Sequence, residues 1–181
     1  MIWRFGSTKR QPTGWLASSF SGGNFLIMEK LNKNFIDFLR LLNSNGVKYL
    51  VIGGYAVGYH GAVRATGDLD VFVETSPENA AALMAVFAAF GFAGPELRQE
   101  IFLEPGKIVR IGRPPLRIEV MNRISGIAFA ECFDQRIEEL IEGVSIPFID
   151  LQSLLKNKAA SGRLKDLSDV EALTKKGRTQ P

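Results

Sequence analysis

Two adjacent glycines followed by two alternating aspartates have the clearest chemical meaning in this sequence. Asp68 and Asp70 follow Gly53 and Gly54 after the intervening segment 55–67. In a strand, positions i and i+2 share a face, so both carboxylates project to the same side. They repel by about 1 kcal/mol in water and by several-fold more in a cleft, which a bound cation would offset. Carboxylate oxygens favour Mg²⁺ or Mn²⁺ over zinc.

A third carboxylate, Glu119, lies in an alternating segment further along the chain. Its neighbours Ile118 and Val120 are expected to be buried, so Glu119 should point to the opposite face. Three acids on adjacent strands can hold two metal ions roughly 3.5–4 Å apart. In such a site Glu119 is also the candidate to accept a proton from an attacking hydroxyl group.

The glycine pair can complement these acids. Gly53 and Gly54 end an apolar run and precede an expected helix. Residues without a Cβ let the backbone approach a triphosphate and turn N–H groups toward it. An ordinary strand-to-helix turn is the alternative interpretation. The pairing with the two aspartates favours the phosphate site.

The elements that must position these residues follow from hydrophobic periodicity and turn residues. Helices are expected at 29–45, 55–61, 77–90, 151–160 with Asp150 as cap, and 165–175. Strands are expected at 47–52, 68–74, 107–111, 116–121, 136–141 and 145–149. This order of elements predicts a mixed α/β (α+β) fold.

Composition indicates one globular domain. The chain has 181 residues, of which 46% are hydrophobic and 23% charged, enough to form a core. The net charge is +3, and segment 1–26 contains basic residues but no acid. We expect a flexible extension over 1–26, a single domain over 27–177 and a tail over 178–181.

Several classes of protein are disfavoured by the sequence. Cys132 is the only cysteine, so it has no partner for an internal disulfide or a CxxC zinc site. No apolar run approaches the roughly 18 residues of a membrane-spanning helix, and residues 1–26 lack the apolar stretch of a signal peptide. We therefore expect a cytoplasmic protein without membrane contact.

The motifs resemble the nucleotidyltransferase superfamily related to DNA polymerase beta, including minimal members of the abortive-infection toxin type. The similarity covers roughly residues 30–175. It is carried by Gly-Gly-Tyr-Ala-Val at 53–57, Arg-x-Thr-x-Asp-Leu-Asp at 64–70 and Asn-Lys-x-Ala-x-Gly-Arg-x-Lys-Asp-Leu-x-Asp at 157–169. It implies a nucleotidyltransferase-like mixed sheet flanked by helices, and metal-dependent transfer of a nucleoside monophosphate from an NTP.

The resemblance also implies roles for individual residues. Asp68 and Asp70 become metal ligands, and Gly53 and Gly54 become nucleotide contacts. Lys158 matches a basic position that can reach the triphosphate, although segment 156–176 can also be read as a solvated helical pair with a contact between Lys165 and Asp169. Arg64 and Thr66 either position a phosphate or satisfy the loop before the strand. The third acid is often Asp in this superfamily, whereas this chain has Glu119.

The acceptor and the partners stay open at the level of sequence. The acceptor is an RNA end, a protein hydroxyl or a small molecule. The toxin-like members imply a cognate antitoxin as a partner, and a second copy of the chain is the other candidate. Two further hypotheses are a nucleotide-binding or regulatory module without turnover and a structural protein that binds no metal.

Overall fold

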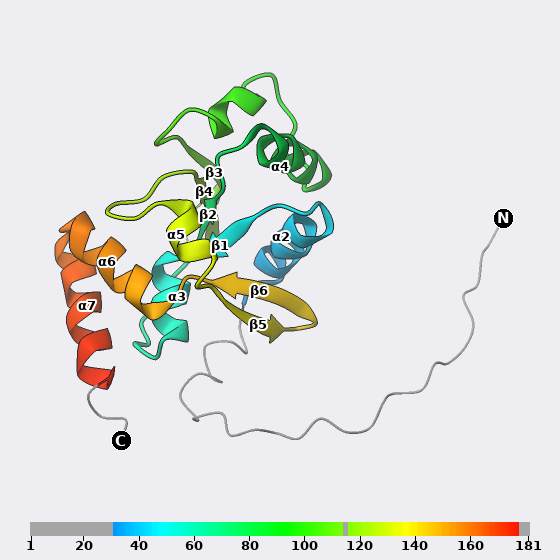
Figure 1. Cartoon of the computed structure of the whole chain (residues 1–181). Helices are drawn as coiled ribbons and strands as arrows, with labels where there is room; N and C mark the ends of the chain where they lie inside the picture. Colours follow the sequence, from blue (N-terminus) through cyan, green and yellow to red (C-terminus); the bar gives the residue numbers. More distant parts are fainter. Residues whose placement is uncertain (1–30, 114–115, 178–181) are drawn as a thin grey trace, which may run out of the picture.

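A six-stranded mixed sheet with helices on both sides forms the described part of the chain, residues 31–113 and 116–177 of this computed structural model (Figure 1). This confirms the mixed α/β class expected from the sequence. The expected extension 1–26 and tail 178–181 lie outside the described residues.

The elements and their bounds agree closely with the expected ones. The helices are α2 (Lys33–Ser44), α3 (Gly53–Tyr59), α4 (Pro77–Ala89), the 3₁₀ helix η1 (Gln99–Phe102), α5 (Phe129–Phe133), α6 (Leu151–Ser161) and α7 (Leu164–Gly177). The strands are β1 (Tyr49–Val51), β2 (Asp68–Val73), β3 (Ile108–Arg113), β4 (Leu116–Met121), β5 (Ile137–Ile141) and β6 (Val144–Phe148). The short helices η1 and α5 were not expected from the sequence.

The order of strands across the sheet is β3-β4-β2-β1-β6-β5. Strands β2 and β4 run parallel, as do β1 and β6, and the other neighbouring pairs are antiparallel. Strands β2 and β4 are therefore direct neighbours although α4, η1 and β3 separate them in the chain. This arrangement brings the two expected acidic segments side by side.

The helices form two layers around this sheet. Helices α2 and α4 lie on one side, and α5, α6 and α7 lie on the other (Figure 1). Fully buried side chains such as Phe38, Leu69, Val71 and Leu83 belong to the core. None of the helices in the described residues combines the length and hydropathy that a membrane crossing requires.

The first helix begins later than the sequence indicated. It was expected from residue 29, but α2 begins at Lys33 because Asn32 is its N-cap and accepts a hydrogen bond from the N–H of Asn34. At the other end Gly46 has a φ of +66°, as expected for a glycine that follows a helix. At α6 the expected cap is confirmed, because the side chain of Asp150 accepts from the N–H of Ser153.

Candidate active site

The register between β2 and β4 brings the three expected acids to one face of the sheet. Asp70 lies opposite Glu119, and Asp68 lies opposite Arg117. Because alternate residues of a strand share a face, all four side chains project to the same side. The structure thus places Asp68, Asp70 and Glu119 together, as the sequence predicted.

Two arginines that the sequence analysis did not single out bind these acids. The Nη2 of Arg117 lies 2.8 Å from Oδ2 of Asp68 and 2.9 Å from Oε1 of Glu119. The Nε of Arg110 donates to the same Glu119 oxygen at 2.9 Å. The Nε of Arg117 is buried and has no hydrogen-bond partner among the described residues. Positive side chains therefore offset part of the acidic charge.

Asp70 is the acid whose charge is least well balanced. Burial raises its pKa to about 6, and the negative charges of Glu119 and Asp68 act in the same direction. A hydrogen bond from the backbone of Gly54 and the positive charge of Lys158 oppose this rise. The ionised form of Asp70 would be stabilised by a further cation beside it.

Close contacts with neighbouring side chains leave no room for a Cβ at Gly53 or Gly54. Gly53 has a φ of +63°, and a Cβ at this position would lie 1.9 Å from Oδ2 of Asp70. A Cβ on Gly54 would lie 2.4 Å from Oγ1 of Thr66. The absence of side chains at both positions lets the start of α3 pack directly against the Asp70 carboxylate and the loop before β2.

Lys158 lies in a buried ion-pair network beneath the site. Its side chain is 5% exposed, and its Nζ lies 2.7 Å from Oδ1 of Asp166 and 2.8 Å from Oδ2 of Asp169. Arg64 binds both carboxylate oxygens of Asp169, at 2.8 and 3.1 Å. The interpretation of this segment as a solvated pair of helices is wrong for these charges, because the turn between α6 and α7 folds Asp166 and Asp169 back onto Lys158.

Arg64 and Thr66 both stabilise the loop before β2. Arg64 joins this loop to α7 through Asp169, and the hydroxyl of Thr66 donates to the carbonyl of Asp68 at 3.4 Å. Of the two alternatives left open by the sequence, these contacts correspond to the structural one. Contact with a phosphate stays a prediction for both residues.

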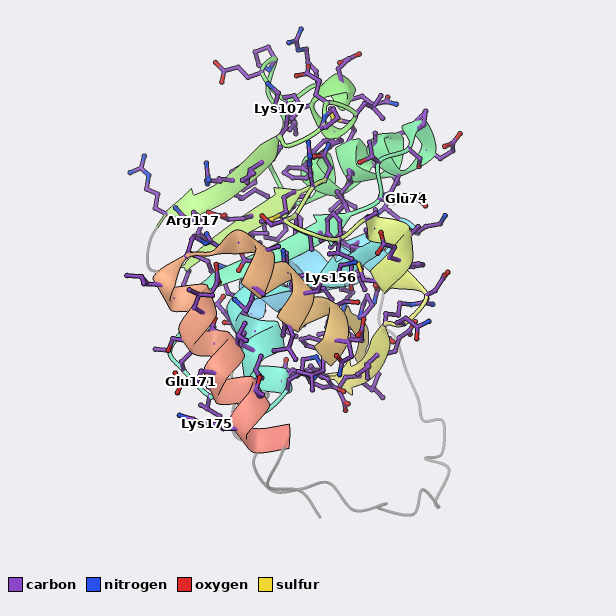
Figure 2. All side chains as sticks on the ribbon, turned by 60° about the vertical axis from the view of Figure 1, so that its left-hand side comes forward. Glu74, Lys107, Arg117, Lys156, Glu171 and Lys175 are labelled. Carbon is purple, nitrogen blue, oxygen red and sulfur yellow. The ribbon has the colours of Figure 1, made fainter. Side chains whose placement is uncertain are left out.

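A cavity of about 420 Å³, termed the site cavity, is lined by two of the acids, Asp70 and Glu119. Helices α6 and α7 run side by side across this side of the sheet (Figure 2). The lining includes residues of the sheet side and of the α6–α7 side: Gly53, Asp70, Arg110, Glu119, Lys158 and Arg163. Arg163 is exposed and donates to Oδ2 of Asp166 at 2.6 Å. It is a basic residue of the site for which the sequence predicted no role.

The donor chemistry fits a hard divalent cation at Asp68 and Asp70, which offer two carboxylates on one strand face. In the described residues, however, no group of three His, Cys, Asp or Glu side chains is arranged to hold a metal ion. Arg117 connects Asp68 with Glu119 instead. A third ligand from Glu119 would require its contacts with Arg110 and Arg117 to change.

Solved structures with a similar fold are nucleotidyltransferases. A Thermotoga maritima protein described as a nucleotidyltransferase has a TM-score of 0.52 at 15% identity, over 81% of this chain and 91% of that one. The antibiotic-resistance factor ANT(2'')-Ia has a TM-score of 0.52 at 11% identity, over 84% and 85%. The lincosamide antibiotic adenylyltransferase LnuA, with lincomycin bound, has a TM-score of 0.50 at 14% identity, over 80% and 96%. These identities support the fold alone.

Sequence comparison adds a family match. No curated protein matches the chain. The model of a family described as "Nucleotidyl transferase of unknown function (DUF2204)" matches residues 31–180.

Proposed function

The chain belongs to the DUF2204 family of nucleotidyl transferases, and from this premise we propose that it moves a nucleoside monophosphate from an NTP to a hydroxyl group with Mg²⁺ or Mn²⁺ as cofactor. The observation that carries the proposal is the position of Asp70. This carboxylate lies against Gly53 at the start of α3 and beside Asp68 and Glu119, with a pKa raised to about 6.

Asp68 and Asp70 are the proposed metal ligands, and Glu119 is the proposed third ligand. A divalent ion bound there would lower the pKa of a hydroxyl nucleophile and offset the charge of the leaving pyrophosphate. The raised pKa of Asp70 supports this assignment, since burial and the negative charges of Glu119 and Asp68 disfavour its ionised form and the nearby Lys158 only partly offsets them.

The proposed NTP site is the site cavity. Gly53 and Gly54 let the backbone approach the phosphates, and Lys158 supplies positive charge from below. Arg163, at the rim, is better exposed for direct contact, because 77% of its side chain is accessible whereas Lys158 is 5% exposed. Arg64 and Thr66 are proposed to support the nucleotide site through the loop before β2.

The proposed reaction is an in-line substitution at the α-phosphorus. The acceptor hydroxyl oxygen forms a bond to this phosphorus, and the bond from phosphorus to the pyrophosphate oxygen breaks. The hydroxyl proton passes to a carboxylate, for which Glu119 is the proposed acceptor. Arg110 and Arg117, which bind Glu119, lie close enough to these acids to offset charge that develops on the phosphate.

The proposal leaves several partners open. ATP, CTP, GTP and UTP are all candidate donors, and an RNA end, a protein hydroxyl and a small molecule are candidate acceptors. A cytoplasmic location and a cognate antitoxin or second copy as partner belong to the same proposal. The resemblance to toxin-type members supports the antitoxin.

A direct test is incubation of the purified protein with each NTP labelled at the α-phosphate, Mg²⁺ or Mn²⁺, and RNA, protein or small-molecule fractions. We expect label in one fraction, and none with the Asp68→Asn, Asp70→Asn double variant. Label transfer by the double variant at the wild-type rate would contradict the assignment of the two acids.

A nucleotide-binding module without turnover is the second candidate. The observation that favours it is the engagement of Glu119 by two arginines, which withholds the third acid from a metal. Binding of an NTP without transfer to any of the three fractions would support this candidate over the enzyme.

A further inference from the structure

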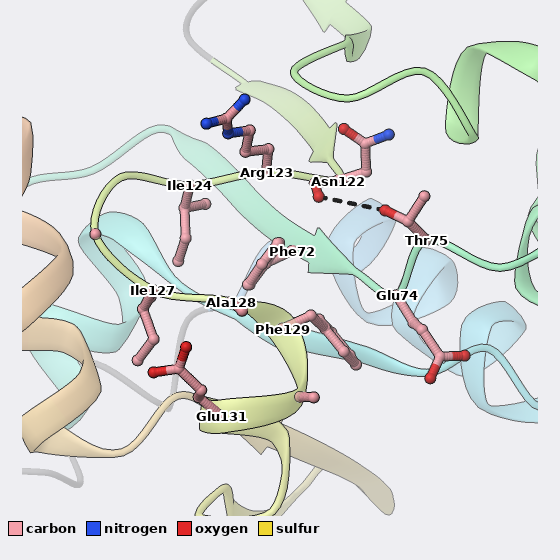
Figure 3. Close-up of a pocket in the computed structure, with 12 residues that line it drawn as sticks. Phe72, Glu74, Thr75, Asn122, Arg123, Ile124, Ile127, Ala128, Phe129 and Glu131 are labelled. Atoms are coloured by element: carbon pink, nitrogen blue, oxygen red, sulfur yellow. Dashed lines mark hydrogen bonds between the residues drawn. The ribbon is translucent and has the colours of Figure 1, made fainter.

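A second cavity of about 620 Å³ opens next to the site cavity, between the end of β2, the loop 122–128 and α5 (Figure 3). Its lining includes Phe72, Glu74, Arg123, Ile124, Phe129 and Glu131. Its size is that of pockets that hold small organic molecules.

The two cavities are adjacent. Arg123 and Ile124 line both of them. Phe72 follows Asp70 by two residues on the same face of β2, and Glu74 lies just beyond the end of this strand. At about 3.3 Å per residue, Phe72 is about 7 Å and Glu74 about 13 Å along the strand from Asp70. The second cavity therefore lies within the length of a molecule of moderate size from Asp70.

The charged side chains that line the two cavities differ in their balance of acids and bases. Four cationic side chains and two carboxylates line the site cavity, which suits a triphosphate: Arg110, Arg123, Lys158 and Arg163 against Asp70 and Glu119. The second cavity has two carboxylates, Glu74 and Glu131, and one cation, Arg123. In Figure 3 Arg123 lies on one side of this cavity, and Glu131 lies on the opposite side, next to Ile127.

Both carboxylates of the second cavity have lysine partners that can give way. Glu74 binds Lys48 at 2.9 Å, and Glu131 binds Lys156 at 3.1 Å. The lysine side chains are 53% and 57% exposed, and ion pairs of this kind contribute little. A cationic ligand can replace these contacts, whereas the two carboxylates would repel the phosphates of a nucleic-acid strand.

The floor of the second cavity is apolar. Phe72 is buried and packs edge to face on Phe129, with ring centroids 5.1 Å apart. Ile124 and Ile127 are partly buried beside them. This surface suits the carbon skeleton of an organic molecule better than the negatively charged phosphates of a nucleic-acid backbone.

We propose that the second cavity, from here the acceptor cavity, binds the acceptor, and that the acceptor is a hydroxyl-bearing organic cation of small-molecule size. The inference rests on the proposed function and names the substrate class of its second site. One acceptor hydroxyl oxygen bonds to the α-phosphorus of the NTP, pyrophosphate leaves, and the hydroxyl proton goes to the carboxylate cluster. The positive charge of the acceptor meets Glu131 and Glu74.

A matched set of acceptors tests the class. The probes are kanamycin, which carries hydroxyls and amines, its fully N-acetylated form, which keeps the hydroxyls without the charge, and a short RNA with a free 3′ hydroxyl. With an α-labelled NTP and Mg²⁺ we expect label in kanamycin and at least about tenfold less in the acetylated form, since acetylation removes the charged hydrogen-bond donors that would bind the carboxylates. Label in the RNA, equal label in both kanamycin forms, or no label in kanamycin would overturn the inference.

Variants of the cavity test the location. Ala130 is exposed and lines the acceptor cavity, whereas Ala85 is exposed on α4, on the other side of the sheet. We expect Ala130→Trp and Glu131→Gln to raise the KM for kanamycin about tenfold or more with an unchanged Kd for NTP, and Ala85→Trp to change neither. An unchanged KM in both cavity variants would overturn the inference.

The two proposals fail in different ways. If the wild-type protein binds no NTP, both the proposed function and this inference are wrong. If the protein binds NTP and labels RNA, the proposed function stands and only the proposed acceptor class is wrong.

Discussion

At the scale of single residues, Asp70 is held in an environment that disfavours its own charge. Burial and the neighbouring acids raise its pKa to about 6 from an ordinary value of 3.8. The folded protein therefore binds the Asp70 proton more tightly than the unfolded chain does. It follows that stability falls as pH rises from about 4 to about 6, and that the cost persists at higher pH.

Replacement of Asp70 by Asn should therefore stabilise the protein without ligand. At pH 7–8 we expect Asp70→Asn to raise the free energy of unfolding by up to about 3 kcal/mol, and the gain should vanish near pH 4. Urea unfolding at a series of pH values measures this. Asp37→Asn, on exposed α2 surface, is the control and should show no such gain. A gain that does not change with pH would contradict the assigned environment of Asp70.

The effect of a side chain at Gly53 can be compared with its effect at Gly46, a glycine with a similar φ. Gly53 and Gly46 have φ values of +63° and +66°, but a Cβ would meet Asp70 at Gly53 and nothing within 4 Å at Gly46. Gly46→Ala should cost about 1 kcal/mol for the left-handed backbone. Gly53→Ala should cost about 2–4 kcal/mol because of the added clash, and should weaken NTP binding. Equal losses of stability in thermal or urea unfolding would show that the contact with Asp70 is not close.

The sequence predicts those site residues whose pattern lies within a single strand, and it misses those whose contacts depend on how strands pair. Asp68, Asp70 and Glu119 were predicted to share a face because each lies in a strand with alternating polarity. Arg110 and Arg117 were not, because their contacts depend on the register of β3 and β2 against β4. No pattern within one strand specifies such a register.

At the scale of elements, the α6–α7 hairpin buries three of its charged side chains, Lys158, Asp166 and Asp169. Gly162 has a φ of +68° and ends α6, after which α7 returns along it. Burial disfavours ionisation of Asp166, but hydrogen bonds from Lys158, Ser161 and Arg163 outweigh this and lower its pKa to about 2. The hairpin is thereby fixed over the acids of β2 and β4.

Removal of the buried Lys158 side chain should lower the free energy of unfolding much more than removal of the exposed Lys156 side chain. We expect Lys158→Ala to lower the free energy of unfolding by about 3–5 kcal/mol, because it leaves Asp166 and Asp169 buried without this partner. Lys156→Ala, which removes an exposed pair with Glu131, should cost less than about 1 kcal/mol. Chemical unfolding of both variants compares them directly. A similar small loss in both would mean that the network is open to water.

The elements themselves were largely predictable, and the exceptions have physical reasons. Long periodic segments such as α4 and β2 were expected within one or two residues of their observed bounds. Helices η1 and α5, of four and five residues, are too short to show a helical period. The expected start of α2 was wrong because the Asn32 cap interrupts an apolar pattern that continues to Leu31.

At the scale of the whole molecule, the site depends on a sheet order that the sequence did not reveal. The parallel pairing of β2 with β4 spans α4, η1 and β3, and it brings Asp70 opposite Glu119. The same order places the loop 122–128, which follows β4, between the two cavities. The proposed NTP cavity and the proposed acceptor cavity thus meet beside one strand.

The most direct test of this account is the affinity of the protein for NTP with and without Mg²⁺, measured by calorimetry for the wild type and for the Asp68→Asn, Asp70→Asn double variant. We expect Mg²⁺ to tighten NTP binding at least about tenfold in the wild type, a gain of about 1.4 kcal/mol, and to have no such effect in the double variant. NTP binding that is equally tight in both proteins, or independent of Mg²⁺, would contradict the assignment of the two aspartates as metal ligands.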